Sequence, residues 1–459
     1  MAIKYLTKFN TETEYNEFLN SNECPYVNVS YIQATDENKY YKEEDELMVQ
    51  PFTMHIDSNL SNDESIPLVF WVQTDPTNSG VTSYFRYRVN NGEWYTHTFT
   101  IDDNPNKGDE NIRLYKGDTV QIICKSNWFN AISVYHEKYD FQFTISGNIM
   151  SLFWGDDYIY APANKLPFPQ IPYDLHGTKL EYIHIVDPVD APVIDASDLW
   201  LPTKNLPEGI FMEMFRNCAD LTAGPDIKAK YLPKNACNGM FMNCTSLTDM
   251  PLILAETVEE GALDNIFRDC TSLVNTTQFH VKKIYNSFGN WMFAGCTSLV
   301  TAPVWNEDVE LNDMTYNYNW FDWTFADCTS LEDMSTWNIR FNEFAAYNSI
   351  FCHCAFGGCT SLTNTPYWGL TYDTWEGCSL DTMFEDATGH GYPPVDTIYF
   401  LFTTGEINDT SGRFASLSQT GTIYLKHGSR YLGDADLSGQ LPCNLPAGWT
   451  VAEYVAPSN

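Results

Sequence analysis

The chain has 459 residues, which is too long for one compact hydrophobic core, so we expect two to four units. Aromatic residues make up 15% of the chain, and this excludes general disorder because disordered chains are poor in aromatic residues. The 60 acidic and 25 basic residues give a formal charge of −35, which argues against nucleic acid or an anionic membrane as ligand, because both bind clustered Lys and Arg.

The sequence lacks the signatures of membrane insertion and of secretion. No apolar run approaches the roughly 20 residues that a membrane helix needs, and the longest, from Ile66 to Val72, is typical of one buried strand. The first ten residues have no apolar segment and no small-residue cleavage site, so they are not a secretory signal. A surface role would then require another route, such as particle assembly followed by lysis of the host.

Residues 1–57 are predicted to be a small N-terminal anchor or docking segment. A capping Thr11 followed three residues later by Glu14 predicts a helix over residues 11–19, and alternation predicts a strand over residues 26–32. So small a unit rarely folds alone, so we expect it to dock on another subunit or a partner. Its apolar side chains are the candidate anchoring residues: Tyr5, Leu6, Phe9, Tyr15, Phe18 and Leu19.

Residues 58–146 have the pattern of a β-sandwich, either Ig-like or jelly-roll-like. The predicted strands cover residues 66–72, 84–89, 93–99, 111–115, 119–124 and 139–145, and turn residues separate them. One acidic loop contains Asp102, Asp103, Asp109 and Glu110. It could hold calcium, but its spacing matches no known calcium loop, so a solvated loop is the simpler interpretation.

One phrase, Met-Phe-x-x-Cys-Thr-Ser-Leu and its variants, recurs from Phe215 to a decayed copy at Phe384, in which Ala387 replaces the cysteine. Successive phenylalanines are 26, 26, 26, 32, 31 and 28 residues apart. Repeats of this length predict a solenoid over residues 206–392, because one coil cannot bury its own apolar side and must stack on the next. The proline-rich residues 147–205 are then a linker and N-terminal cap, and residues 393–459, with strands over 395–403, 421–425 and 445–451, a C-terminal cap.

Each coil is expected to place its phenylalanine, cysteine and leucine inward. We expect the Met-Phe-x-x-Cys part to form a short helical turn. A strand should follow it, starting at prolines such as Pro251, Pro303 and Pro366, so that one strand per coil builds a narrow parallel sheet. The fold class predicted for the whole chain is multidomain, mainly β with short helices.

The 13 cysteines do not predict a disulfide scaffold. Six occupy the same position of the repeat, where a cysteine acts as a small buried apolar residue, so we expect reduced and packed thiols. One cluster resembles a set of metal ligands, but its spacing lacks paired C-x-x-C motifs, so no metal site is predicted. It consists of Cys352, His353, Cys354, Cys359 and Cys378.

Two stretches of the solenoid are dense in aromatic residues and lie within its longer spacings. Insertions in a solenoid often emerge on the binding face, and Tyr and Trp suit sugars or proteins as ligands. Packing within the larger coils is the alternative, and Trp323, next to the phrase, is expected to pack in this way. The candidate ligand-binding residues are Tyr316, Tyr318, Trp320, Tyr367, Trp368, Tyr372 and Trp375.

No catalytic constellation is found in the sequence. The nine histidines are scattered, Gly421 and Gly428 flank a strand rather than a phosphate-binding turn, and the paired carboxylates carry no information among 60 acids. We therefore predict a protein that is not an enzyme and binds no cofactor. A glycan-cleaving site formed between subunits is the alternative.

The phrase Met-Phe-x-x-Cys-Thr-Ser-Leu-x-x-x-Pro resembles the BspA-type leucine-rich repeat of bacterial surface adhesins, over residues 205–390. The flanks resemble virion proteins of phages that infect Bacteroidales, including crAss-like phages, in the opening around Lys4 and in the phrases at 87–94 and 147–152. The resemblance implies a virion protein, a head fibre, decoration protein or tail fibre. Its N-terminus would dock on other virion proteins and its solenoid would bind a host-surface glycan or protein, and fibres of this kind are commonly homo-oligomers. The alternatives are a bacterial BspA-type adhesin and a glycan-cleaving tailspike.

Overall fold

The structure is a computed structural model, and it divides the chain into two compact units. The first comprises residues 1–210 and 218–229, and the second residues 211–217 and 230–459. The structure describes residues 33–34, 39–40, 50–57, 65–67, 83–99, 113–125, 142–154, 193–203, 206, 208–285, 287–305, 307–312, 320–341, 353–367, 383–384, 391–401, 417–429, 432 and 446–455.

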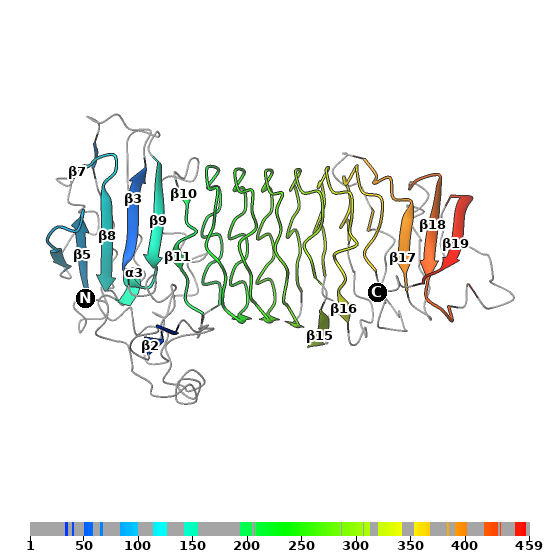
Figure 1. Cartoon of the computed structure of the whole chain (residues 1–459), viewed down its shortest axis with the longest axis horizontal. Coiled ribbons are helices and arrows are strands. Elements are labelled where there is room, and N and C mark those ends of the chain that lie inside the picture. Colours follow the sequence, from blue (N-terminus) through cyan, green and yellow to red (C-terminus); the bar gives the residue numbers. More distant parts are fainter. Residues whose placement is uncertain are drawn as a thin grey trace. The chain divides into compact units, whose positions relative to one another are not determined.

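The first unit is built on one mixed sheet (Figure 1), with the strand order β10-β9-β3-β8-β5-β6 and with β11 also paired to β9. The strands are β3 (Phe52–Asp57), β5 (Ser83–Val89), β6 (Tyr95–Phe99), β8 (Thr119–Lys125), β9 (Gln142–Asn148), β10 (Val193–Asp195) and β11 (Leu199–Trp200). Two short ladders accompany it, β1 (Gln33–Ala34) with β2 (Lys39–Tyr40) and β4 (Ile66–Pro67) with β7 (Arg113–Leu114).

A buried joint connects β3 and β9 to the short helix α3 (Ser151–Trp154). Gly147 has a φ of 81°, and a Cβ there would lie 2.3 Å from the carbonyl oxygen of Pro51, so only glycine fits. The Ser151 hydroxyl accepts a hydrogen bond from the Phe52 amide (2.7 Å) and donates one to the Ile122 carbonyl (2.9 Å). The serine thereby links two neighbouring strands from within the core.

Several predicted strands of this unit are confirmed in part or in full. β5, β6 and β8 match the predicted runs closely, whereas β4, β7 and β9 overlap theirs only in part. Strand β3, which pairs with both β8 and β9, was not predicted. The described strands form one sheet and small ladders, so the two-layer sandwich stays a prediction. The predicted helix over residues 11–19 and strand over 26–32 lie outside the described residues.

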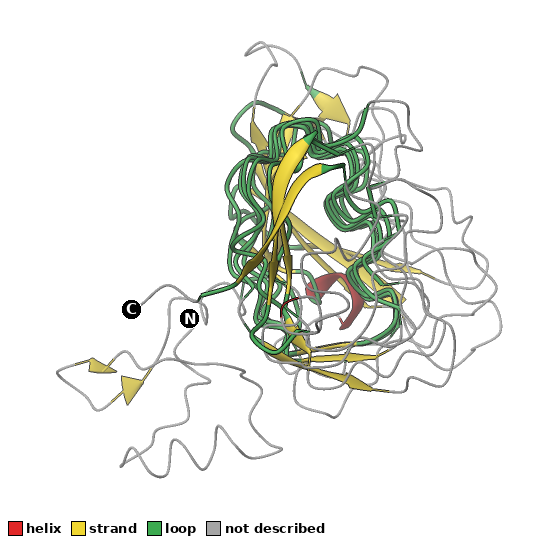
Figure 2. Cartoon of the chain, turned by 90° about the vertical axis from the view of Figure 1, so that its right-hand side faces the viewer, coloured by secondary structure: helices red, strands yellow, loops and turns green. Residues whose placement is uncertain are grey.

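The second unit is a β-solenoid, and its coils superimpose when viewed end-on (Figure 2). Five strands from successive coils form a parallel sheet in sequence order. They are β12 (Tyr231–Leu232), β13 (Thr257–Val258), β14 (Lys283–Tyr285), β15 (Asp308–Asn312) and β16 (Arg340–Phe341).

The expected parallel pairing is confirmed, but the expected place of the strands is wrong. At Pro251 and Pro303, where strands were expected to start, the described chain forms only isolated bridges, such as that of Trp305 with Trp337. The strand expected at 366–368 lies partly outside the described residues. The strand lies farther along each coil. In this solenoid, a proline followed by apolar residues marks a buried connection between strands. Apolar content alone does not distinguish such a connection from a strand.

The Met-Phe-x-x-Cys segment forms a ladder of turns, so the predicted helical turn is wrong. In one coil, alternate amides donate to the next coil: Asn235 to Glu260, Cys237 to Ala262, Gly239 to Asp264, Phe241 to Ile266 and Asn243 to Arg268. The amides between them donate to the carbonyl three residues earlier, as Met240 does to Cys237. Every fourth residue of this coil has positive φ (Asn235, 55°; Gly239, 62°; Asn243, 62°), which an α-helix cannot accommodate. We call this segment the turn ladder.

The repeated phenylalanines stack on one another along the inside of the solenoid. Ring centroids of Phe215, Phe241, Phe267, Phe293, Phe325 and Phe356 follow each other at 5.4 to 6.1 Å. The 32-residue spacing does not interrupt this row, and Phe384 of the decayed copy lies 5.9 Å from Phe356. Aromatic neighbours in such a row contribute about 0.5–1.5 kcal/mol per pair beyond their burial.

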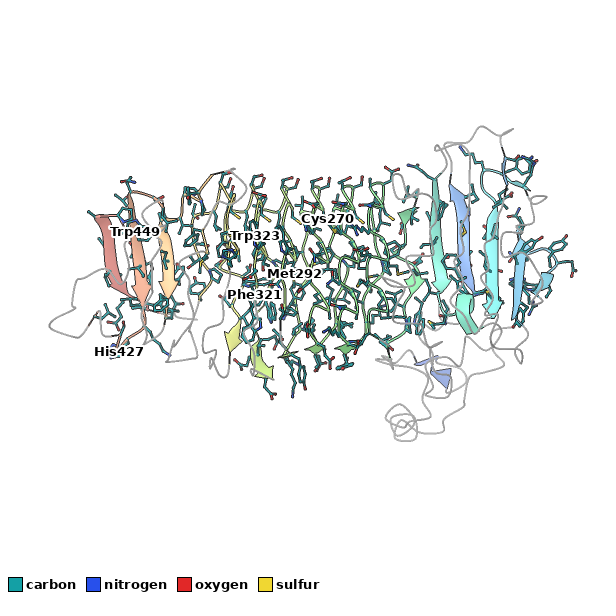
Figure 3. The ribbon with its side chains drawn as sticks, turned by 180° about the vertical axis from the view of Figure 1, so that it is seen from behind. Cys270, Met292, Phe321, Trp323, His427 and Trp449 are labelled. Atoms are coloured by element: carbon teal, nitrogen blue, oxygen red, sulfur yellow. The ribbon has the colours of Figure 1, made fainter. Side chains whose placement is uncertain are left out.

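The repeated cysteines form a second inward row. From Cys244 onward, each repeated thiol donates to a phenylalanine carbonyl of the preceding coil, as Cys270 does to Phe241 at 3.1 Å, and the leucines beside the cysteines are fully buried. Figure 3 shows Cys270 and Met292 among the stacked coils. The nine cysteines in the described residues are buried thiols, which agrees with the expectation of packed, reduced cysteines.

The solenoid is followed by a three-stranded parallel sheet of β17 (Thr397–Phe400), β18 (Thr420–Leu425) and β19 (Gly448–Glu453). The strands overlap the three predicted near the C-terminus. A bridge between Asn364 and Thr397 pairs the last repeated coil with β17. On the inner face, Gly421 leaves room for the buried Trp449 ring, which a Cβ would approach to 2.7 Å.

Candidate binding surface

Two of the candidate ligand-binding residues lie in the described part of the chain. Trp320 is 4% exposed, so its ring offers almost no surface to a ligand. Tyr367 is half-buried and belongs to a tyrosine cluster described below. The other five, Tyr316, Tyr318, Trp368, Tyr372 and Trp375, lie outside the described residues, as do all six anchoring candidates, Tyr5, Leu6, Phe9, Tyr15, Phe18 and Leu19.

A stack of tryptophans lines one side of the turn ladder. Trp291 and Trp323 are parallel, with centroids 4.5 Å apart and planes 3° apart. The Arg268 guanidinium lies 4.4 Å from the Trp291 ring, and His353 meets Trp323 edge-on at 6.1 Å. The neighbouring coils thus occupy the ring faces, so the stack mainly holds coils together. Trp323 therefore packs against the neighbouring coils, as expected, although its side chain is only half-buried.

The cysteine and histidine cluster and the acidic loop provide no described metal site. His353 and Cys354 are described, with Nε2 and Sγ 3.4 Å apart, whereas Cys352 and Cys378 are not. Among the described residues, no group of three or more metal-ligating side chains comes together. The acidic loop at 102–110 lies outside the described residues.

Four tyrosines from different segments meet on the outward face of the C-terminal sheet. We call Tyr367, Tyr399, Tyr424 and Tyr454 the tyrosine surface. Tyr399 of β17 stacks on Tyr424 of β18, with centroids 5.2 Å and planes 17° apart. Tyr367 lies 4.2 Å from Tyr399, and Tyr454 meets both of these rings edge-on at 5.6 and 5.9 Å. All four are half-buried, so each keeps part of its side chain at the surface, where a ligand can contact it.

Strand register explains why these rings meet. Tyr399 and Tyr424 are direct partners in a parallel pair, so their side chains leave the same face side by side. Two residues earlier, the register places Thr397, Thr422 and Thr450 in one line across the three strands, which we call the threonine row. The hydroxyls of Thr422 and Thr450 are 3.2 Å apart and exposed.

Two phenols of the tyrosine surface have raised pKa values. Burial, and then the hydrogen bond that the Tyr399 hydroxyl donates to Tyr367, raises the pKa of the Tyr399 phenol above its ordinary value, and burial also raises the pKa of Tyr454. At the edge of the sheet, the exposed His427 Nδ1 lies 2.8 Å from a carboxylate oxygen of Glu453 (His427 and Trp449 mark this sheet in Figure 3). The surface therefore offers rings and hydroxyl groups, with one histidine–carboxylate contact at the edge of the sheet.

Three of the four tyrosines were not predicted as site residues, although the sequence contains a signal for two. Thr-Ile-Tyr occurs at 397–399 and again at 422–424, so equal register would have placed Tyr399 beside Tyr424. Tyr454 follows β19, and its amide donates to the Leu425 carbonyl (2.8 Å). No sequence pattern indicates that its ring turns toward Tyr367.

In the part of the chain that the structure describes, no helix has the length and apolar content to span a membrane. Comparisons with models of known protein families, with curated proteins and with solved structures find no match to this chain.

Proposed function

We propose that this chain is a phage virion structural protein, a head fibre, decoration protein or tail fibre, whose N-terminal segment anchors it to the particle and whose solenoid unit binds a host-surface glycan or protein. The observation that carries the binding role is the tyrosine surface. It gathers four half-exposed rings from four segments of the second unit and sets them beside a row of hydroxyls.

The chemistry of this surface supports binding rather than catalysis. Phenols with raised pKa values are poor nucleophiles and poor bases at neutral pH, because they stay protonated. Tyrosines bury large area on binding and lose little conformational entropy, so they serve well as anchors of an interface. The phage-like flanks support the virion assignment by resemblance, and the repeated phrase supports a binding role because it resembles a repeat of surface adhesins.

Two measurements test this proposal. Mass spectrometry of purified particles should detect the chain, and the purified protein should bind host cells. Replacement of Tyr399 with Ala should weaken cell binding about tenfold, because Tyr399 contacts Tyr367, Tyr424 and Tyr454. The matched control is Tyr231→Ala, since Tyr231 is 46% exposed on the solenoid but lies in β12. Absence from the particles, or no binding to host cells, would contradict the proposal.

A bacterial adhesin with BspA-type leucine-rich repeats is the second candidate, favoured by the Met-Phe-x-x-Cys-Thr-Ser-Leu phrase. The two functions differ in where the protein occurs. An adhesin would be found at the surface of uninfected cells that carry the gene, whereas a virion protein would be found in particles. Fractionation of both samples with one antibody separates the candidates.

A further inference from the structure

The row of stacked tyrosines stops at β18, although the sheet continues to β19. The register aligns Tyr399 on β17, Tyr424 on β18 and Ala452 on β19. One face of the Tyr424 ring contacts Tyr399. The opposite face looks toward β19, where the aligned side chain is only a methyl group. Tyr424 and Ala452 are both half-exposed. We call this ring face the Tyr424 face.

The spacing at this point fits one further ring. Neighbouring strands lie about 4.8 Å apart, and the Tyr399 and Tyr424 centroids are 5.2 Å apart, so a flat ring above Ala452 would continue the stack. A tyrosine or tryptophan at position 452 would supply such a ring from the protein itself. With alanine there, a ring from a ligand can take the place.

The groups around the Tyr424 face indicate the class of ligand. Thr422 precedes Tyr424 by two residues and Thr450 precedes Ala452 by two, so both hydroxyls lie on the same face as the ring. Hydroxyls and neutral phenols can donate and accept hydrogen bonds, which suits a polyhydroxylated ring. An acidic sugar fits less well, because the chain carries a net charge of −35 and repels anions at long range.

We propose that the Tyr424 face is a subsite for one pyranose ring of a neutral glycan. The apolar side of the sugar stacks on the phenol, and its hydroxyls bond to the threonine row at Thr422 and Thr450. This subsite rests on the proposed binding function and assigns it a ligand class and a position.

The full chain is first screened on a microarray of defined oligosaccharides, some neutral and some containing uronic acid. Calorimetry then measures its affinity for the neutral oligosaccharide that gives the strongest signal. Tyr424→Ala removes the stacking face, and Ala452→Trp fills the space with an indole from the protein. Each should weaken that affinity at least about tenfold, because each removes stacking by a different means. Tyr231→Ala should leave it unchanged.

Folding is checked separately by the thermal unfolding midpoint of each variant. Ala452→Trp adds a contact at an exposed position, so it should fold even if Tyr424→Ala does not, and the subsite can still be judged. Binding of uronic-acid glycans only, absence of any array signal, or unchanged affinity in Ala452→Trp would overturn the subsite. If host-cell binding persists in Ala452→Trp while glycan binding is absent, the proposed function stands and only the subsite is wrong.

Discussion

At the scale of single residues, a chain of polar groups runs from coil to coil beside the phenylalanine row. The Asn290 amide and side-chain nitrogens donate to the two carboxylate oxygens of Asp264 (3.0 and 3.2 Å). Asn290 in turn accepts from the Asp322 amide (3.0 Å), and Asp322 accepts from the His353 amide (3.0 Å). Burial raises the pKa of Asp264 to about 6 and that of Asp322 to about 7. These carboxyls therefore titrate near neutrality.

This network predicts a pH-dependent stability. Because the folded pKa of Asp322 lies above the ordinary 3.8, the folded state binds more protons than the unfolded state between about pH 4 and pH 7. The stabilising contribution of Asp322 to the free energy of unfolding is therefore greatest at low pH, and it falls as the pH rises through this window. The substitution Asp322→Asn keeps an acceptor for the His353 amide and removes the charge. It should therefore stabilise the protein at pH 8, by on the order of 2 kcal/mol.

Urea denaturation of both proteins at pH 5 and pH 8 checks this prediction. The free energy of unfolding of the variant should exceed that of the parent by more at pH 8 than at pH 5. The contributions of all other carboxylates are the same in both proteins and cancel in this difference. Asp249→Asn is a suitable control, since hydrogen bonds from Thr248 and Asn275 lower the pKa of Asp249, so its loss should not stabilise. An equal effect of Asp322→Asn at both pH values would rule out the titration of Asp322 as the cause.

Sequence reasoning at this scale succeeded where the residue type was constant. Phenylalanine, cysteine and leucine recur with little change, and the structure confirms their inward rows. The polar row was missed because its members vary among Asp264, Asn290 and Asp322, which share no chemistry apart from short polar side chains. The tyrosine surface was missed in part because Tyr454 lies outside the Thr-Ile-Tyr pattern that Tyr399 and Tyr424 share.

At the scale of the element, the turn ladder depends on residues that tolerate positive φ. One position, directly before the cysteine, is occupied in successive coils by Asn217, Asn243, Asp269, Gly295, Asp327 and Gly358, all with φ between 60° and 76°. The two glycines each follow an aspartate in the preceding coil. A Cβ on Gly295 would lie 2.3 Å from Asp269 Oδ1, and one on Gly358 would lie 2.1 Å from Asp327 Oδ1. The aspartate side chain thus extends over the glycine of the next coil.

Gly295→Ala should therefore destabilise the solenoid for two separate reasons, by about 2 kcal/mol in total. One is backbone strain at φ 76°, and the other is the overlap with Asp269. In an Asp269→Gly background the overlap is gone, so the same substitution should cost only about 1 kcal/mol. Thermal or urea unfolding of the four proteins in a double-mutant cycle measures the difference. Equal costs in both backgrounds would show that the overlap plays no part.

The turn ladder also shows why a helix was the wrong prediction for this segment. Amides such as Met240 donate to the carbonyl three residues earlier, so the local composition and apolar spacing resemble those of a helical turn. The decisive signal lies in the coils where asparagine, aspartate or glycine occupies every fourth position, because these residue types adopt positive φ most readily. In other coils the equivalent middle position holds Glu213, Trp291, Trp323 or Cys354, so the signal is absent there. That signal was present in the sequence, in Asn235, Gly239 and Asn243.

At the scale of the whole solenoid, equivalent coils predict that one coil can be removed. Deletion of the 26 residues 242–267 joins Phe241 to Arg268, which keeps the phase of the repeat. The shortened protein should fold and unfold cooperatively, at a slightly lower temperature because one stacking interface is lost. Deletion of residues 242–254 should prevent folding, because it shifts phenylalanine, cysteine and leucine out of their rows. Circular dichroism and limited proteolysis compare the two deletion variants. If both fold equally well, the side chains of successive coils do not need to stay aligned in their rows.

The direction of the hydrogen bonds in the turn ladder determines how two solenoids could join end to end. Apart from Phe321, the alternate amides of the turn ladder donate toward the C-terminal neighbour, as Phe241 does to Ile266, and the thiols of the cysteine row donate toward the N-terminal neighbour, as Cys270 does to Phe241. The two ends of the stack are therefore different, and the stack has a direction. Two such stacks could extend one another only head to tail, so a self-assembled filament of these coils would have one uniform orientation.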